Sequence, residues 1–160
     1  MSVRKILSWT AVILWMALIF YLSHQPAADS NELSTGITEV IIQTIEKVAP
    51  NMELDIRSLN HIVRKNAHFF AYLVLGVLVI NALRVNGVKG YRSIALALGI
   101  CILYAISDEV HQLFIPGRSC EVRDVIIDAA GASVGIVVYL VVGKVVGRRK
   151  NVSEFIEGIG

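Results

Sequence analysis

The most chemically informative part of this chain is a short polar run that follows a long apolar segment. The run reads Ser107-Asp108-Glu109-Val110-His111-Gln112. Carboxylates can act as general bases or nucleophiles, and histidine can transfer protons near neutral pH. Ionisable groups are costly inside a bilayer, so a cluster of them at the end of a membrane helix indicates a functional site.

The composition indicates that the surroundings of this run are a membrane. Hydrophobic residues make up 55% of the chain and charged residues 18%, with a mean hydropathy of +0.64. The apolar residues fall into blocks, which predict an all-α integral membrane protein with transmembrane helices at about residues 6–22, 64–84, 92–112 and 122–146. We expect residues 1–150 to form a single transmembrane domain and residues 151–160 to form a cytoplasmic tail.

The segment between the first two membrane helices has helical patterning of its own. Apolar residues recur at helical spacing between about residues 31 and 49, with charged and amide side chains on the opposite side. This pattern predicts an amphipathic helix on the outer membrane surface. A further helical pattern begins near Ser58 and is expected to run unbroken into the second membrane helix.

The distribution of charge predicts the orientation. One side of the membrane receives nine basic and two acidic residues, whereas the other receives six basic and eleven acidic residues. Because basic residues favour the cytoplasmic side, we expect a protein of the bacterial plasma membrane with both termini in the cytoplasm. The segments 23–67 and 108–123 then face outward.

Polar residues from different helices are predicted to meet at one depth. His68, Asp108 and Asp128 each lie fifteen residues from the inner end of their helix. At 1.5 Å per residue this is roughly 22 Å, still inside a hydrocarbon core of about 30 Å. We therefore expect one polar layer near the outer leaflet.

Helical spacing also places these residues on common faces. Lys65, His68, Tyr72 and Gly76 form one stripe, which Arg64 joins, and Tyr104, Asp108, His111 and Gln112 form another. The last helix carries Asp124, Asp128, Gly131 and Gly135 on one face, where Gly131-x-x-x-Gly135 predicts close helix packing.

These motifs together resemble those of the VanZ-like family. They are Ser23-x-Gln25, Arg64-Lys65-x-x-His68-Phe69-x-x-Tyr72, Asp108-Glu109-x-His111-Gln112-x-Phe114-x-x-x-Arg118 and Asp124-x-x-x-Asp128-x-x-Gly131. The resemblance spans roughly residues 9–140. It implies a role in resistance to the glycopeptide teicoplanin, but it supplies no agreed reaction.

The residue types favour an outward site for a phosphate-bearing lipid or a lipid-linked cell-wall intermediate, and the resemblance adds teicoplanin as a candidate partner. Arg64, Lys65 and Arg118 would hold the anion, with Arg118 folded back by a turn at Pro116-Gly117. The candidate catalytic residues are Asp108, Glu109, His68 and His111, and the remaining candidate binding residues are Gln112, Asp124, Asp128 and Tyr72. Membrane lipids are the expected partners, and nucleic acid is not.

Three alternatives remain open. A divalent metal could bind His68, His111, Asp108 and Glu109, but familiar ligand spacing is absent and nearby bases oppose a cation, so no metal or other cofactor is expected. In a purely structural network, Arg64 and Lys65 would neutralise Asp108 and Asp128 while His68 bonds Gln112. A binding protein without catalysis would capture an amphiphile in the same cleft.

Other residues carry weaker expectations. Trp9, Trp15, Tyr21 and Tyr91 are predicted to face lipid or the membrane interfaces. His24 and His61 are predicted to be solvated surface residues. No disulfide is predicted between Cys101, inside the third helix, and Cys120, in the loop after it.

Overall fold

The computed structural model describes residues 2–26, 35–36, 56–116, 118 and 120–157. Its helices are α1 (Val3–Ser23), α3 (Ile56–Val85), α4 (Gly90–Gln112) and α5 (Val122–Glu157), and the described residues contain no β-strand. All four helices are long and apolar enough to cross a membrane, which confirms the predicted all-α class with four such helices. The predicted amphipathic helix at 31–49 lies outside the described residues, apart from the helical Thr35 and Gly36.

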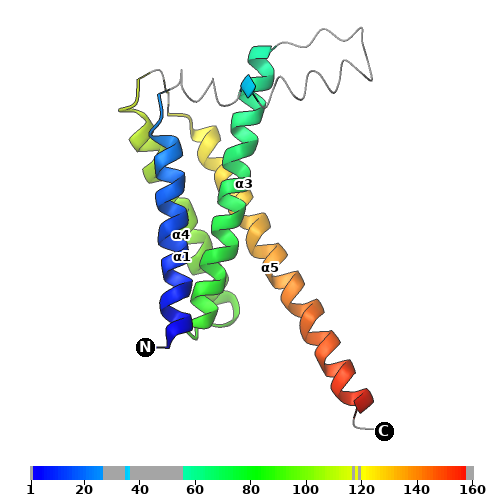
Figure 1. The fold of residues 1–160 in the computed structure, drawn as a ribbon. Coiled ribbons are helices and arrows are strands. Elements are labelled where there is room, and N and C mark those ends of the chain that lie inside the picture. The colour runs from blue at the N-terminus through cyan, green and yellow to red at the C-terminus, as the bar shows by residue number, and fades with distance from the viewer. Residues whose placement is uncertain (1, 27–34, 37–55, 117, 119, 158–160) are drawn as a thin grey trace, which may run out of the picture.

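Helix α3 is the centre of the bundle. It packs against α1, α4 and α5, and its contact with α5 is the most extensive. In Figure 1, α1, α3 and α4 run side by side, whereas α5 crosses them obliquely and leaves the bundle toward its C-terminus. We call the end that contains Ser23, Lys65, Gln112 and Val122 the polar end, and the opposite end, with the α3–α4 turn, the basic end.

Glycines bring α3 and α5 into backbone contact in the half nearer the polar end. A Cβ atom added at Gly131 would overlap the carbonyl oxygen of Phe69, and one added at Gly135 would overlap that of Leu73. From the other side, a Cβ at Gly76 would overlap the carbonyl oxygen of Ala132. The predicted packing role of these glycines is therefore confirmed.

The buried core lies between α3 and its neighbours. Fully buried residues of α3 meet small side chains of α4 and the inner face of α1; they include Tyr72, Leu75, Val79, Ile80, Ala97, Cys101, Ala105 and Val12. Many large apolar side chains on the opposite faces are exposed, as expected for helices surrounded by lipid. Trp15 was predicted to face lipid or an interface, but its indole Nε1 donates to the carbonyl oxygen of Ala71 at 2.8 Å and ties α1 to α3.

A glycine turn connects α3 to α4 at the basic end. Gly87 adopts a φ of +96°, and the amide of Val88 donates to Leu83 O while that of Gly87 donates to Arg84 O, each at 3.0 Å. This hydrogen-bond pattern ends a helix with a left-handed residue that glycine adopts without strain. The turn fixes Arg84 at the end of α3.

The start of α3 and the end of α5 can be compared with the sequence prediction. Helix α3 begins at Ile56, in agreement with the helical pattern predicted from Ser58 onward. Helix α5 continues to Glu157, past residue 150, where a separate tail was expected to begin. No proline interrupts this segment, so the backbone hydrogen bonding of the helix can continue beyond the apolar span.

Candidate functional site

Asp108 is held at the polar end by the last residue of α1. The hydroxyl Oγ of Ser23 donates to Asp108 Oδ2 at 2.7 Å, and both side chains are buried. The second carboxylate oxygen, Oδ1, has no hydrogen-bond partner among the described residues. Asp108 therefore has one oxygen anchored and one free inside the bundle.

Glu109 is also buried but points toward the start of α5. Its Oε2 accepts a hydrogen bond from the backbone amide of Glu121 at 3.0 Å. Consecutive residues on a helix project about 100° apart, so Asp108 and Glu109 serve different neighbours. Glu109 fastens the loop between α4 and α5, whereas Asp108 faces the interior.

Asp128 of α5 completes the buried acidic centre. Its side chain is fully buried, and neither carboxylate oxygen has a hydrogen-bond partner among the described residues. Asp108 and Glu109 lie close enough to interact with it electrostatically. The hydroxyl of Tyr72, also buried and without a described partner, interacts with both Asp108 and Asp128. Buried polar groups are normally paired, so this group of unpaired ones indicates a role other than packing.

Lys65 pairs with acids at the rim, whereas His68 lies beside the buried Asp128. Lys65 Nζ lies 2.9 Å from Asp124 Oδ1 and 3.4 Å from Glu121 Oε2. His68 Nδ1 lies 3.8 Å from Asp128 Oδ1. The structural network considered above is therefore wrong in detail, because Lys65 does not neutralise Asp108 or Asp128.

Arg118 lies near the buried acids and is tied to the segment that follows α1. Its amide donates to Ile115 O at 3.1 Å and closes a turn, and its Nε donates to Gln25 O at 3.1 Å. Desolvation and the neighbouring guanidinium of Arg64 lower the pKa of Arg118, while Asp108 and Glu109 act in the opposite direction. Arg118 thus lies between a like charge, Arg64, and the two acids Asp108 and Glu109.

A small pocket opens between α3 and α5 beside these residues. It is lined by Arg64, Lys65, His68, Asp124, Ile127 and Asp128, and its volume is about 10 Å³. That volume is close to the minimum of about 10–15 Å³ that a single water molecule needs. In this conformation only a group about as large as one water molecule would fit beside Asp128.

A match to a family model covers most of the chain that forms this site. The model of the VanZ/LLP1 family matches residues 8–143. The chain belongs to the VanZ/LLP1 family. A search of curated proteins and a search of solved structures found no match.

In this VanZ/LLP1 chain, His111 and Gln112 are among the predicted site residues that do not line the pocket. His111 pairs with His24 through a hydrogen bond of 3.0 Å between its Nε2 and Nδ1 of His24, and its ring packs on Phe20. Gln112 is buried, but its Nε2 has no hydrogen-bond partner in the described part of the chain, so the expected bond with His68 is not formed. His68 and His111 thus occupy different surroundings.

The described residues do not contain three His, Cys, Asp or Glu side chains that could hold a metal ion together. The separation of His68 from His111 explains this for the set considered above. Both cysteines are free, with Cys101 buried and Cys120 exposed.

Sequence reasoning missed several residues that position the site. His24 was expected to be merely solvated, and Glu121 was not singled out. Ser23 was named only as part of the motif Ser23-x-Gln25, which was the available signal for its role. Tyr104, whose hydroxyl donates to Met16 O at 2.6 Å, fixes α4 against α1 below Asp108.

Proposed function

We propose that this VanZ-family protein contributes to teicoplanin resistance by acting on a phosphate-bearing lipid or lipid-linked cell-envelope intermediate at its polar end. The observation that carries the proposal is the pair of buried acids, Asp108 and Asp128, next to Arg64 and Arg118; three of their four carboxylate oxygens have no hydrogen-bond partner in the described structure. Purely structural polar groups in a bundle normally satisfy one another.

The anion would bind to the guanidinium groups first. Arg64 forms no ion pair with another described residue, and Arg118 uses its Nε for a backbone carbonyl, which leaves other donors available. Arginine suits phosphate because its planar fork gives bidentate contacts. Lys65 is already paired with Asp124 and Glu121, so we assign it to shaping the rim.

Asp108 is the residue that we assign to proton transfer. Ser23 fixes one of its oxygens, while the other faces the buried centre with Tyr72 and Asp128. A positioned carboxylate with one free oxygen suits a general base that activates water or a hydroxyl group. Glu109 accepts from a loop amide, so its proposed part is to hold the loop rather than to react.

We infer that the polar end faces outward from a bacterial cytoplasmic membrane. Arg84 and Lys144 line the groove at the opposite end, Lys89 precedes α4 there, and α1 begins at that end (Figure 1). Basic residues favour the cytoplasmic side. Teicoplanin acts from outside, so an outward site would meet the drug or the envelope precursors.

A binding role without turnover is the second candidate. The pocket beside Asp128 has room for about one water molecule, which suits capture of a headgroup at the rim more directly than enclosure of a substrate. Lipid extracts from cells with and without the protein separate the candidates. A changed lipid species indicates catalysis, whereas enrichment of an unchanged lipid on the purified protein indicates binding.

The deciding experiment measures growth inhibition by teicoplanin and by vancomycin in a sensitive Gram-positive host. The intact chain should protect selectively against teicoplanin, and Asp108→Asn should lose most of that protection, because one acid–base group contributes roughly 10²–10⁴-fold to a reaction rate. Ser23 can still donate to the new amide oxygen, so membrane levels should match. Arg118→Lys should also weaken protection if bidentate contacts matter.

Two outcomes would contradict the proposal. If the intact chain gives no protection, teicoplanin is not its task. If Asp108→Asn prevents accumulation in the membrane, and an Asp108→Leu variant of matched shape accumulates normally without changing protection, the acid has a structural role only.

A further inference from the structure

A second cavity lies at the basic end, remote from the acidic centre. Its volume is about 800 Å³, and it lies between the C-terminal half of α5 and the helices α3 and α4. It is lined by Val77, Arg84, Gly90, Ile94, Val138, Tyr139, Leu140, Val142, Gly143, Lys144 and Val146. This volume falls within the range of about 300–1,000 Å³ typical of small-molecule sites.

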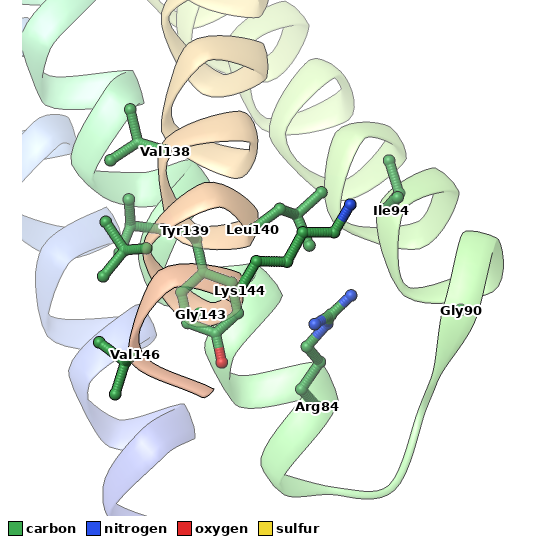
Figure 2. A pocket seen from close by; sticks show the side chains of 11 residues that line it. Arg84, Gly90, Ile94, Val138, Tyr139, Leu140, Gly143, Lys144 and Val146 are labelled. Carbon is green, nitrogen blue, oxygen red and sulfur yellow. The ribbon is translucent and has the colours of Figure 1, made fainter. Parts of the chain in front are cut away.

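Two cations from different helices face this groove. Figure 2 shows Arg84 of α3 and Lys144 of α5 extending into the same space, with Ile94 and Gly90 of α4 across from them. Neither forms an ion pair with another described residue, and Nε of Arg84 is buried without a hydrogen-bond partner there. The groove therefore presents uncompensated positive charge and an unused donor.

The structure also holds Arg84 in position. Its guanidinium carbon lies 5.7 Å from the centre of the Tyr139 ring, and the Tyr139 hydroxyl donates to Asn81 Oδ1 at 3.3 Å. A cation over an aromatic face is attracted to it, and the tyrosine is anchored by its hydroxyl. Arg84 is thus oriented toward the groove before any ligand arrives.

The walls of the groove suit hydrocarbon and open sideways to the membrane. Val138, Val142 and Val146 follow one another along α5 at four-residue spacing, and each is about half exposed. The basic pair lies near the ends of the apolar spans Ile62–Val85 and Val122–Val146, at the level where lipid headgroups meet acyl chains. Charge is at the membrane boundary, and apolar surface extends from it toward the bilayer interior.

We propose that this groove binds an anionic phospholipid. Its phosphodiester would contact Arg84 and Lys144, and the part of its acyl chains nearest the headgroup would lie along the valines of α5. Basic pockets between membrane helices are suited to anionic headgroups. Nothing in this inference depends on the activity of the polar end.

Native mass spectrometry of the full chain in neutral detergent tests the proposal. The protein is titrated with phosphatidylglycerol and with phosphatidylcholine of identical chains. Wild-type protein should bind phosphatidylglycerol preferentially, and the double variant Arg84→Gln/Lys144→Gln should bind it at least about tenfold more weakly. The control Lys89→Gln/Arg92→Gln removes equal charge from exposed residues at the same end that do not line the groove, and it should bind as wild type does.

A third variant tests the groove without changing its charge. A Cβ at Gly143 meets nothing within 4 Å, so Gly143→Leu should fold while filling the space between the helices. It should lower the binding of phosphatidylglycerol although both cations remain. This variant keeps the test decisive if the double variant fails to fold.

Several results would overturn the proposal. Equal losses in both double variants would indicate a diffuse basic surface. Displacement of the lipid by glycerol phosphate at the same concentration would indicate a site for a free phosphate group. A dimer of the wild-type chain that excludes phosphatidylglycerol and becomes monomeric in Gly143→Leu would show that a second copy occupies the groove.

Discussion

The two halves of the contact between α3 and α5 differ in how closely the helices pack and in the sign of the charge between them. Toward the polar end, glycines let the two backbones touch, and acidic side chains are buried beside them. Toward the basic end, α5 departs from α3, and the space between them is a groove with two cations (Figures 1 and 2). The same helix pair thus forms a closed acidic region and an open basic one.

The difference follows from side-chain size at successive turns of α5. Gly131 and Gly135 allow close approach, whereas Tyr139, the next residue at four-residue spacing, is large. Close contact excludes lipid and water from Asp128, whereas separation admits an elongated ligand. A membrane helix can therefore shield charged groups at one end and expose a binding surface at the other.

The largest expected effect is on the closed half. Gly131→Ala would place a methyl group into the carbonyl of Phe69 and force α3 and α5 apart. We expect a loss of stability of about 1–3 kcal/mol or more, as for other overpacked contacts, together with reduced accumulation in the membrane. Thermal unfolding in detergent measures this. Gly99→Ala is the control, because its Cβ meets nothing within 4 Å; equal behaviour of the two variants would contradict the close contact.

The next effect concerns the buried acid in that half. Asp128→Asn removes a buried carboxylate whose oxygens have no hydrogen-bond partners in the described structure. Replacing a buried carboxylate that lacks hydrogen-bond partners by a neutral group of the same shape should leave Tm unchanged or raise it. The corresponding gain in the free energy of unfolding is at most about 1–3 kcal/mol. Protection against teicoplanin should nevertheless fall. A clear loss of stability would instead assign Asp128 to the fold.

A smaller effect separates two neighbouring bases of the polar end. Lys65→Met breaks the ion pairs with Asp124 and Glu121, whose side chains are partly exposed, so the loss of stability should be at most about 1 kcal/mol. Arg64→Met should leave Tm unchanged but weaken protection, because Arg64 has no ion pair with another described residue. The reverse pattern in denaturation and growth assays would exchange the roles that we assign to them.

The smallest effect reports on the loop that closes the polar end. Local desolvation and the Glu109 carboxylate, which also hydrogen-bonds the thiol, raise the pKa of Cys120. A raised pKa means less thiolate at a given pH, so maleimide labelling of Cys120 should require a higher pH than labelling of a free thiol. Glu109→Gln should shift the labelling profile to lower pH, and an unchanged profile would show that the two groups do not interact. Cys101 is buried and should not react.

Much of this arrangement could be predicted from the sequence. Apolar blocks fixed the four spans, and equal spacing from the helix ends placed His68, Asp108 and Asp128 in one layer. Helical periodicity identified the glycine face of α5. These predictions depend only on helix rise, helix period and residue size, which the surroundings alter little.

Other features depend on quantities that periodicity does not contain. The choice of Asp124 rather than Asp128 as the partner of Lys65 depends on the rotation and height of α5 relative to α3. The bond from Trp15 to Ala71 and the pair of His24 with His111 also depend on how separate helices dock. The groove at the basic end requires the crossing angle of α5, which no local pattern supplies.

The length of α5 gives the molecule a mechanical property. Its 36 residues span about 54 Å, well beyond the hydrocarbon core of about 30 Å. The part of α5 from Gly135, where it touches α3, to Glu157 is about 33 Å long. A tilt of this part by about 5° would displace its C-terminal end by about 3 Å. A slight rearrangement around Asp128 would therefore be amplified into a movement on the opposite side of the membrane.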